Sequence, residues 1–330
     1  MEKKELSIWV QAILCVPKVG RKTAWKIFEN LPEDISSRDE FIGFVEKASE
    51  GIPRMPSLDK SLMIEMLEKA EGIIEQTCSV NRGSVLNYSE FPNSLRMMDD
   101  PPLLLHCLGN TSLIGMPGTA VIGTREPTPH GEKAARQFGE ILAQQDQVVV
   151  SGLALGCDTG GHIGCLEKSG KTIAVLDHGL DSIYPSQNRD LAKRILSANG
   201  LLVSEYSFGT SVRGPYFVER DRIQAGLSNQ VIVVETGIKG GTLHTVGFAE
   251  KNGIPVFALD HPEELQSNKQ VLGNRMLLKE ERAQPLTPNF DEIKKILQRE
   301  EKADLESTET EKETSPGPVE IKKDIQTELF

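Results

Sequence analysis

The segment TAVIGTREPTPHGEKAARQF, at residues 119–138, combines a short apolar run, a loop that opens on a glycine, and a helical pattern. The segments VVVSGLALGCDTGGHIGCL (148–166) and VIVVETGIKGGTLHTVGFAEKNGIPVFALDHP (231–262) repeat this order. Such short apolar runs have the length of strands buried on both faces, which is typical of parallel sheets. Their alternation with helical patterns predicts an α/β fold with a Rossmann-like, doubly wound and mostly parallel sheet.

The glycine-rich loops follow the predicted strands, and therefore lie at the carboxyl ends of those strands. Backbone N–H groups in such loops, beside the positive N-terminus of the next helix, are well placed to bind phosphate. The sequence therefore predicts a site for a phosphate backbone or a nucleotide. We expect its residues to be Gly123, Thr124, Arg125, Ser151, Gly152, Arg220, Arg222, Lys239, Gly240, Gly241 and Thr242.

Arginine and lysine side chains would supply positive charge to this site. Arg125 carries a planar guanidinium that suits phosphate oxygens, although an arginine in such a loop is often only solvated or salt-bridged. Arg220 and Arg222 begin a predicted helix two residues apart and so point in different directions. One can face the site while the other stabilises the fold. Asp221, between them, can pair with one arginine and weaken a phosphate contact.

Asp158 and His162 are four residues apart and share one face of a predicted helix. One histidine and one aspartate do not complete a zinc site. We therefore expect Asp158 to fix its loop or cap the helix, and His162 to bond to it or pack inside. The sequence shows no complete catalytic constellation and predicts no metal site.

A series of motifs in the same order resembles the DprA/Smf family of bacterial DNA-processing proteins. These motifs are GTR (123–125), SGLALGCD (151–158) with His162, TIAVLDHGLDSIYP (172–185) with Asn188, SEY (204–206), FVERDRIQAGLS (217–228) and KGGTLHT (239–245). The chain departs from the family at several positions. It has His130 where a tyrosine is usual, Asp221 where an asparagine is usual, and Asp260-His261-Pro262 where the family tends to have Pro-Gly.

The resemblance implies a protein that binds single-stranded DNA, forms a homodimer, hands the strand to RecA recombinase, and needs no cofactor. It leaves the pathway open among natural transformation, repair and antiphage defence. One alternative is a nucleotide-binding or phosphoribohydrolase-like enzyme, but related hydrolases carry a catalytic glutamate where this chain has Thr245. Another is an antitoxin or defence-system partner whose DNA contact has faded, which Asp221 and the acidic composition favour.

Composition limits the partners. A net charge of −11, of which −5 belongs to residues 301–330, argues against a general basic coat for nucleic acid. Any DNA contact must come from a local cationic cluster and depend strongly on salt. The five cysteines are scattered and contain no C-x-x-C pair, so neither a disulfide framework nor a zinc ribbon is expected. The sequence shows neither a signal peptide nor a membrane-length apolar run, which predicts a cytoplasmic protein without a membrane partner.

At 330 residues the chain is long enough for about two domains with extensions. We expect a helical domain of the SAM or helix-hairpin-helix type at 1–80 and the Rossmann-like domain at 81–300. Residues 301–330 are acidic and poor in apolar side chains, which predicts a disordered tail.

Two short motifs outside the Rossmann-like region suggest further contacts. In the first domain, a predicted turn near Lys18, Arg21 and Lys22 can contact phosphate or only pack within a helical bundle. The final residues QTELF resemble peptides that dock on the bacterial sliding clamp. Gln326, Leu329 and Phe330 would be its anchors, the alternative being a chance apolar end.

Overall fold

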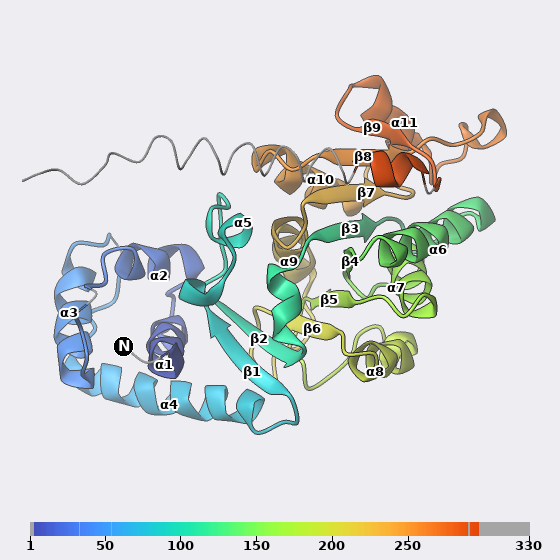
Figure 1. The fold of residues 1–330 in the computed structure, drawn as a ribbon. Helices are drawn as coiled ribbons and strands as arrows, with labels where there is room; N and C mark the ends of the chain where they lie inside the picture. Colours follow the sequence, from blue (N-terminus) through green and yellow to red (C-terminus); the bar gives the residue numbers. More distant parts are fainter. Residues whose placement is uncertain (1–2, 33, 54, 290, 297–330) are drawn as a thin grey trace, which may run out of the picture. The chain divides into compact units, whose positions relative to one another are not determined.

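The computed structural model describes residues 3–32, 34–53, 55–289 and 291–296 (Figure 1). The described residues up to 288 belong to one compact unit, and the described residues from 289 onward belong to a second. The predicted acidic tail and the predicted clamp-binding residues Gln326, Leu329 and Phe330 lie outside the described residues. Among the described helices, none is long and apolar enough to cross a membrane.

The N-terminal part consists of helices that enclose their own core. They are α1 (Lys3–Cys15), α2 (Arg21–Phe28), α3 (Arg38–Glu50) and α4 (Lys60–Cys78). Trp9 and Phe41 are buried and stack with ring centroids 4.5 Å apart. Ser37 starts α3 with a capping box, in which its side chain accepts from the Glu40 N–H. Leu104 of the sheet joins this core, so the helices and the sheet share buried surface.

A nine-stranded sheet forms the rest of the unit, in the order β1-β2-β6-β5-β4-β3-β7-β8-β9. The strands are β1 (Gly83–Asn87), β2 (Leu104–Gly109), β3 (Gly118–Ile122), β4 (Val148–Ser151), β5 (Thr172–Leu176), β6 (Leu201–Ser204), β7 (Gln230–Val233), β8 (Val256–Leu259) and β9 (Gln284–Leu286). Neighbours from β6 to β9 are parallel, whereas β2 is antiparallel to both β1 and β6. The predicted α/β fold with a mostly parallel sheet is confirmed.

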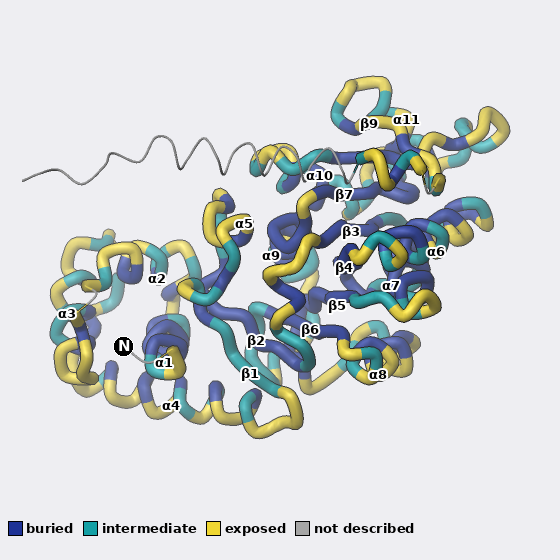
Figure 2. Tube along the Cα trace, viewed as in Figure 1, coloured by how far each residue is buried: buried dark blue, intermediate teal, exposed yellow. Residues whose placement is uncertain are grey.

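Helices cover both faces of the sheet, which is why the central strands are dark blue in Figure 2. They are α5 (Asn93–Arg96), α6 (Pro129–Gln144), α7 (Cys157–Glu167), α8 (Arg189–Ser197), α9 (Gly214–Gly226), α10 (Thr242–Lys251) and α11 (Leu272–Lys279). In β5, Val175 belongs to the apolar cluster that includes residues of α9, whereas Ala174 and Leu176 belong to the cluster that includes residues of α8. This alternation explains why the strands are apolar at nearly every position.

Candidate phosphate-binding pocket

The three glycine-marked loops meet where the strand order reverses. β3 is hydrogen-bonded to β4 on one side and to β7 on the other. The chain runs outward from β3 through β4, β5 and β6, and then returns to β7 on the opposite side. Such a topological switch point leaves a crevice at the carboxyl ends of the strands. A cavity of about 620 Å³ lies there, and its lining includes Gly123, Thr124, Arg125, Ala154, Asp158, Phe217, Arg220, Asp221, Lys239, Gly240, Gly241 and Thr242.

Arg125 and Lys239 are the exposed cations that the sequence placed in this pocket. Arg125 lies with its guanidinium carbon 4.9 Å from the ring centroid of Phe217, a cation–π contact. Neither Arg125 nor Lys239 forms an ion pair with any residue that the structure describes. Both side chains are therefore exposed at the pocket without an ion-pair partner, although Glu126 also lines it.

Arg220 is different, because it is buried and held by the protein itself. Its Nη1 donates to the carbonyl oxygen of Val175 at 3.1 Å, and its Nε lies 3.3 Å from Asp221 Oδ1. A Cβ at Gly152 would overlap this guanidinium, so glycine is required there for steric reasons. The guanidinium therefore forms part of the pocket lining.

Three carboxylates surround Arg220. The pKa values of Asp158, Asp177 and Asp221 are all raised by burial, and the charge of Arg220 offsets this only in part. The pKa of Asp221 rises to about 7, since burial is reinforced by repulsion from the other two carboxylates. One arginine thus faces three buried carboxylates, and burial makes ionisation of each of them less favourable.

We expect Asp221→Asn to stabilise the protein at pH 8 and to have little effect at pH 4.5. The folded-state pKa lies above the unfolded value of about 3.9, so the folded protein binds the proton more tightly, and stability falls as pH rises from about 4 to 7. Asparagine removes this penalty and keeps an oxygen for the Gln224 side chain, which donates to Asp221 Oδ1 at 3.0 Å. The gain at pH 8 should be roughly 2 kcal/mol, with the full shift as an upper limit.

Urea unfolding at both pH values measures this difference. Asp190→Asn, at an exposed carboxylate on α8, is the matched control and should leave stability within about 0.5 kcal/mol at either pH. An Asp221→Asn variant that is equally stable at pH 4.5 and 8 relative to the wild type would show that Asp221 titrates as an ordinary surface carboxylate.

Three predicted phosphate contacts lie outside the pocket lining. Ser151 is fully buried, and its hydroxyl donates to the carbonyl oxygen of Val121 at 2.7 Å. The Gly152 N–H donates to Asp158 Oδ2 at 3.1 Å, so the donor expected to face a ligand is used within the loop. Arg222 is only 1% exposed and forms ion pairs with Glu205 and Asp100. Of the two arginines two residues apart, Arg220 reaches the pocket and Arg222 holds the fold.

Asp158 and His162 are both buried beside the second loop. Asp158 Oδ2 also accepts the Ala154 N–H at 3.3 Å, which fixes the loop after β4. His162 Nδ1 lies 2.7 Å from the Thr172 hydroxyl, so its partner is Thr172 rather than Asp158. Burial and the Arg220 charge lower the pKa of His162 to about 3, so the ring is neutral.

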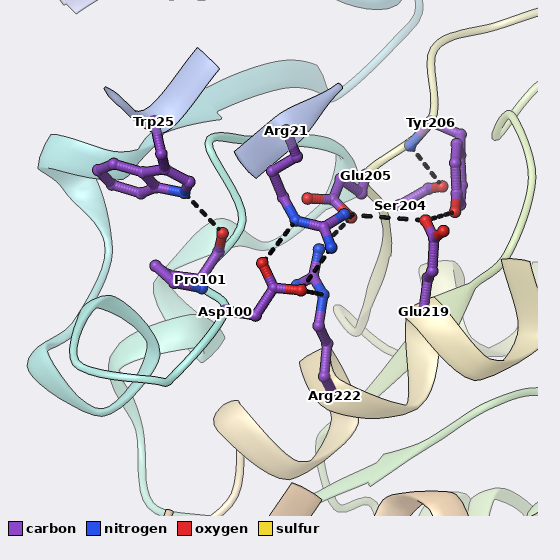
Figure 3. Close-up of polar contacts among 9 residues, drawn as sticks. All are labelled: Arg21, Trp25, Asp100, Pro101, Ser204, Glu205, Tyr206, Glu219 and Arg222. Atoms are coloured by element: carbon purple, nitrogen blue, oxygen red, sulfur yellow. Dashed lines mark hydrogen bonds and ion pairs between the residues drawn. The ribbon is translucent and has the colours of Figure 1, made fainter. Parts of the chain in front are cut away.

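The turn between α1 and α2 leads into Arg21, whose side chain contacts residues of the sheet region. Figure 3 shows Arg21 donating to Asp100 and Glu205, beside Arg222. The carboxylates raise the pKa of Arg21 above its ordinary value despite burial, which on its own would lower it. Of the cations predicted at this turn, Arg21 is therefore committed to the protein, whereas Lys18 and Lys22 are exposed.

Several aromatic rings lie at or near the pocket, and the sequence motifs did not predict a role for them. Phe217 lines the pocket, and Tyr184, 46% exposed, lies 6.2 Å from it between ring centroids. Tyr206 and Tyr216 stack at 4.1 Å, and the guanidinium of Arg213 lies 5.8 Å from the Tyr216 ring. The sequence could have indicated Phe217 as a pocket residue, because it stands in the same motif as Arg220.

Comparison with known proteins places these features in a family. Residues 84–298 match the family model described as DNA recombination-mediator protein A. The protein Smf of Synechocystis is 40% identical over 181 residues, which are 54% of this chain and 45% of that protein. The DNA processing protein DprA of Streptococcus pneumoniae is 39% identical over 169 residues, 51% of this chain and 59% of that protein. The chain thus spans about half the length of these curated relatives.

Solved structures agree with the fold. The crystal structure of DprA from Streptococcus pneumoniae superposes with a TM-score of 0.71 at 25% identity, over 89% of this chain and 97% of that one. DNA processing protein A from Helicobacter pylori, described for its single-stranded DNA binding mode, gives a TM-score of 0.59 at 32% identity. That match covers 67% of this chain and 98% of the other.

Proposed function

The chain belongs to the DNA recombination-mediator protein A family, also named DprA/Smf, and from that premise we propose that it binds single-stranded DNA in the pocket at the switch point. The observation that carries the proposal is the pair of unpaired cations, Arg125 and Lys239, on the rim of one pocket that an aromatic ring also lines. Such a pocket offers the two things that a single strand needs, charge for its phosphates and an aromatic face for its bases.

The arrangement favours a single strand over a duplex. Phe217 and Tyr184 present rings beside the pocket, and bases can stack on such rings only when they are not already paired within a helix. The backbone would follow the glycine loops, where Gly240, Gly241 and the N-terminus of α10 offer close approach and a positive dipole. The Helicobacter pylori relative that binds single-stranded DNA supports this assignment.

We propose that the protein acts in DNA processing and recombination rather than as an enzyme. Thr245, which is buried on α10, stands where related hydrolases carry a catalytic glutamate. Homodimer formation and transfer to RecA recombinase remain predictions from the family resemblance. Docking on the sliding clamp remains a prediction from the final residues QTELF, and action in the cytoplasm one from the sequence pattern.

A free nucleotide is the second candidate ligand, because a volume of about 620 Å³ falls in the range of small-molecule sites. It would bind through the same loops with its phosphate at the N-terminus of α10. An interaction protein with faded DNA binding, the remaining alternative, would show neither ligand.

Fluorescence anisotropy of labelled oligothymidine tests the proposal. We expect binding at 50 mM salt that weakens about 20-fold at 200 mM, as for roughly three phosphate contacts on a single strand. A duplex of equal length should bind more weakly, and thymidine monophosphate at the same concentration should not compete. Competition by the monophosphate would favour the nucleotide site, and no binding at 50 mM salt would contradict both.

A further inference from the structure

His130, Glu235 and His261 meet at one point although they are far apart in the sequence. His130 lies in the first turn of α6, Glu235 follows β7, and His261 follows β8. One nitrogen or oxygen from each lies within 4.8 Å of the others. Glu235 is fully buried, His261 is 5% exposed and His130 is half-buried. The cluster is therefore a largely buried set of nitrogen and oxygen ligands from three segments that lie far apart in the sequence.

Glu235 is oriented by hydrogen bonds that leave part of its carboxylate open. Its two oxygens accept from the Thr128 N–H at 2.7 Å and the Thr128 hydroxyl at 2.6 Å. A Cβ at Gly131 would overlap the carboxylate, so glycine makes room for it at the start of α6. A carboxylate has about four acceptor sites, so these two bonds leave capacity for another partner.

The tautomer of His261 is fixed by the backbone. Its Nε2 lies 3.2 Å from the carbonyl oxygen of Val234, which can only accept, so Nε2 carries the proton and Nδ1 carries a lone pair. Nδ1 is buried, has no hydrogen-bond partner among the described residues, and lies 3.8 Å from Glu235 Oε1. A lone pair thus faces a carboxylate with no donor between them.

His130, the third member of the cluster, also has an unsatisfied ring nitrogen. Its Nδ1 is buried and, within the described chain, has no hydrogen-bond partner. The rings of His130 and His261 are 5.2 Å apart between centroids and tilted by 57°. Buried ring nitrogens without a hydrogen-bond partner are costly, so an electropositive occupant of the cluster would stabilise the arrangement.

We propose that His130, Glu235 and His261 form a binding site for a divalent metal ion of the zinc class. Two imidazoles and one carboxylate are a common ligand set for such ions, with a fourth position left to water. Bonds of about 2.1 Å in a tetrahedral site separate ligand atoms by roughly 3.4 Å. The ligand atoms of the cluster lie within 4.8 Å of one another, with 3.8 Å between His261 Nδ1 and Glu235 Oε1, so side-chain movements must bring them closer. The Val234 carbonyl and Thr128 are the outer partners that orient such ligands.

The site lies beside the proposed DNA pocket without being part of its lining. Glu235 accepts the Thr124 N–H on its backbone oxygen at 2.7 Å, so a metal on its side chain would brace the loop that carries Arg125. The inference does not rest on DNA binding, since a bound metal would stabilise the fold whether or not that loop contacts a strand.

The full chain, stripped with a chelator and kept reduced, should be titrated with Zn²⁺ against a zinc indicator and with Co²⁺ by visible absorption. We expect one equivalent per chain with micromolar or tighter affinity, and cobalt bands of a nitrogen and oxygen site without thiolate charge transfer. His261→Gln and His130→Gln should each weaken binding at least 30-fold. His244→Gln, at an exposed histidine of α10, should leave it unchanged.

Thermal unfolding supplies a second readout that does not depend on an indicator. Excess Zn²⁺ should raise the Tm of the wild type and of His244→Gln by several degrees and leave His261→Gln unmoved, with all three alike without metal. Less than 0.2 equivalents of metal on the wild type, equal loss in His244→Gln and His261→Gln, or a thiolate spectrum would overturn the assignment. A water or a shared proton would then occupy the cluster.

Discussion

Replacing Glu205 with glutamine is expected to lower the free energy of unfolding by about 3 kcal/mol. Glu205 accepts from Arg21 Nη1 at 3.2 Å and also from Arg222 Nη2, so one carboxylate neutralises two guanidinium groups (Figure 3). Arg222 is only 1% exposed, and its Nε and Nη1 already lack hydrogen bonds to described residues. Without the charge of Glu205, Arg222 would share Asp100 with Arg21, whose other partner is the more distant Glu219 at 3.8 Å, and the buried Arg222 would be left partly unpaired.

Urea unfolding at pH 7 measures this effect. Glu250→Gln is the matched control, because Glu250 forms a two-point pair with Arg282 at the surface, where such pairs contribute less than about 1 kcal/mol. If Glu205→Gln costs no more than Glu250→Gln, the network between α2 and the sheet contributes nothing special to stability.

The double variant Arg125→Ala/Lys239→Ala is expected to bind single-stranded DNA about 100-fold more weakly than the wild type. Each substitution removes one exposed charge of the pocket that forms no ion pair with a described residue, and loss of a phosphate contact typically costs roughly a factor of 10 at low salt. The slope of log affinity against log salt should shrink by about 1.4, since each contact on a single strand contributes about 0.7.

A matched double variant controls for the change in net charge. Arg194 on α8 and Lys251 at the end of α10 are exposed and absent from the pocket lining. Arg194→Ala/Lys251→Ala should therefore keep its affinity within about threefold and keep most of its salt slope. Equal losses in the two double variants would mean that the protein attracts DNA only through its general charge.

The sheet and its three loops could be predicted because their signals are local. A run such as Val148–Ser151 is short, apolar and followed by glycine, which specifies a buried strand and its loop together. β1 is only half-buried along most of its length, and β9 has just three residues, so neither shows a clear apolar pattern.

Side-chain roles at the site depend on residues far apart in the chain. The sequence showed that Arg220 and Arg222 point in different directions, but not which of them reaches the pocket. That depends on Glu205, which forms an ion pair with Arg222. The sequence predicts a free N–H at Gly152, but in the structure this group donates to Asp158, six residues later in the chain.

The histidine cluster was invisible in the sequence for the same reason. His130 and Glu235 are separated by 105 positions, and only the adjacency of β3 with β7 and of β7 with β8 brings their segments together. His130 and His261 each depart from the family pattern, but they lie far apart in the sequence and no spacing rule connects them.

Ultraviolet crosslinking of oligothymidine to the full chain, followed by mass spectrometry of the peptides, tests the pocket most directly. Thymine stacked on exposed Tyr184 or half-buried Phe217 should crosslink to the peptides that carry these rings, and the yield should fall in Arg125→Ala/Lys239→Ala. Crosslinks confined to residues 3–32, around Lys18 and Lys22, would place the strand on the N-terminal helices and contradict the account.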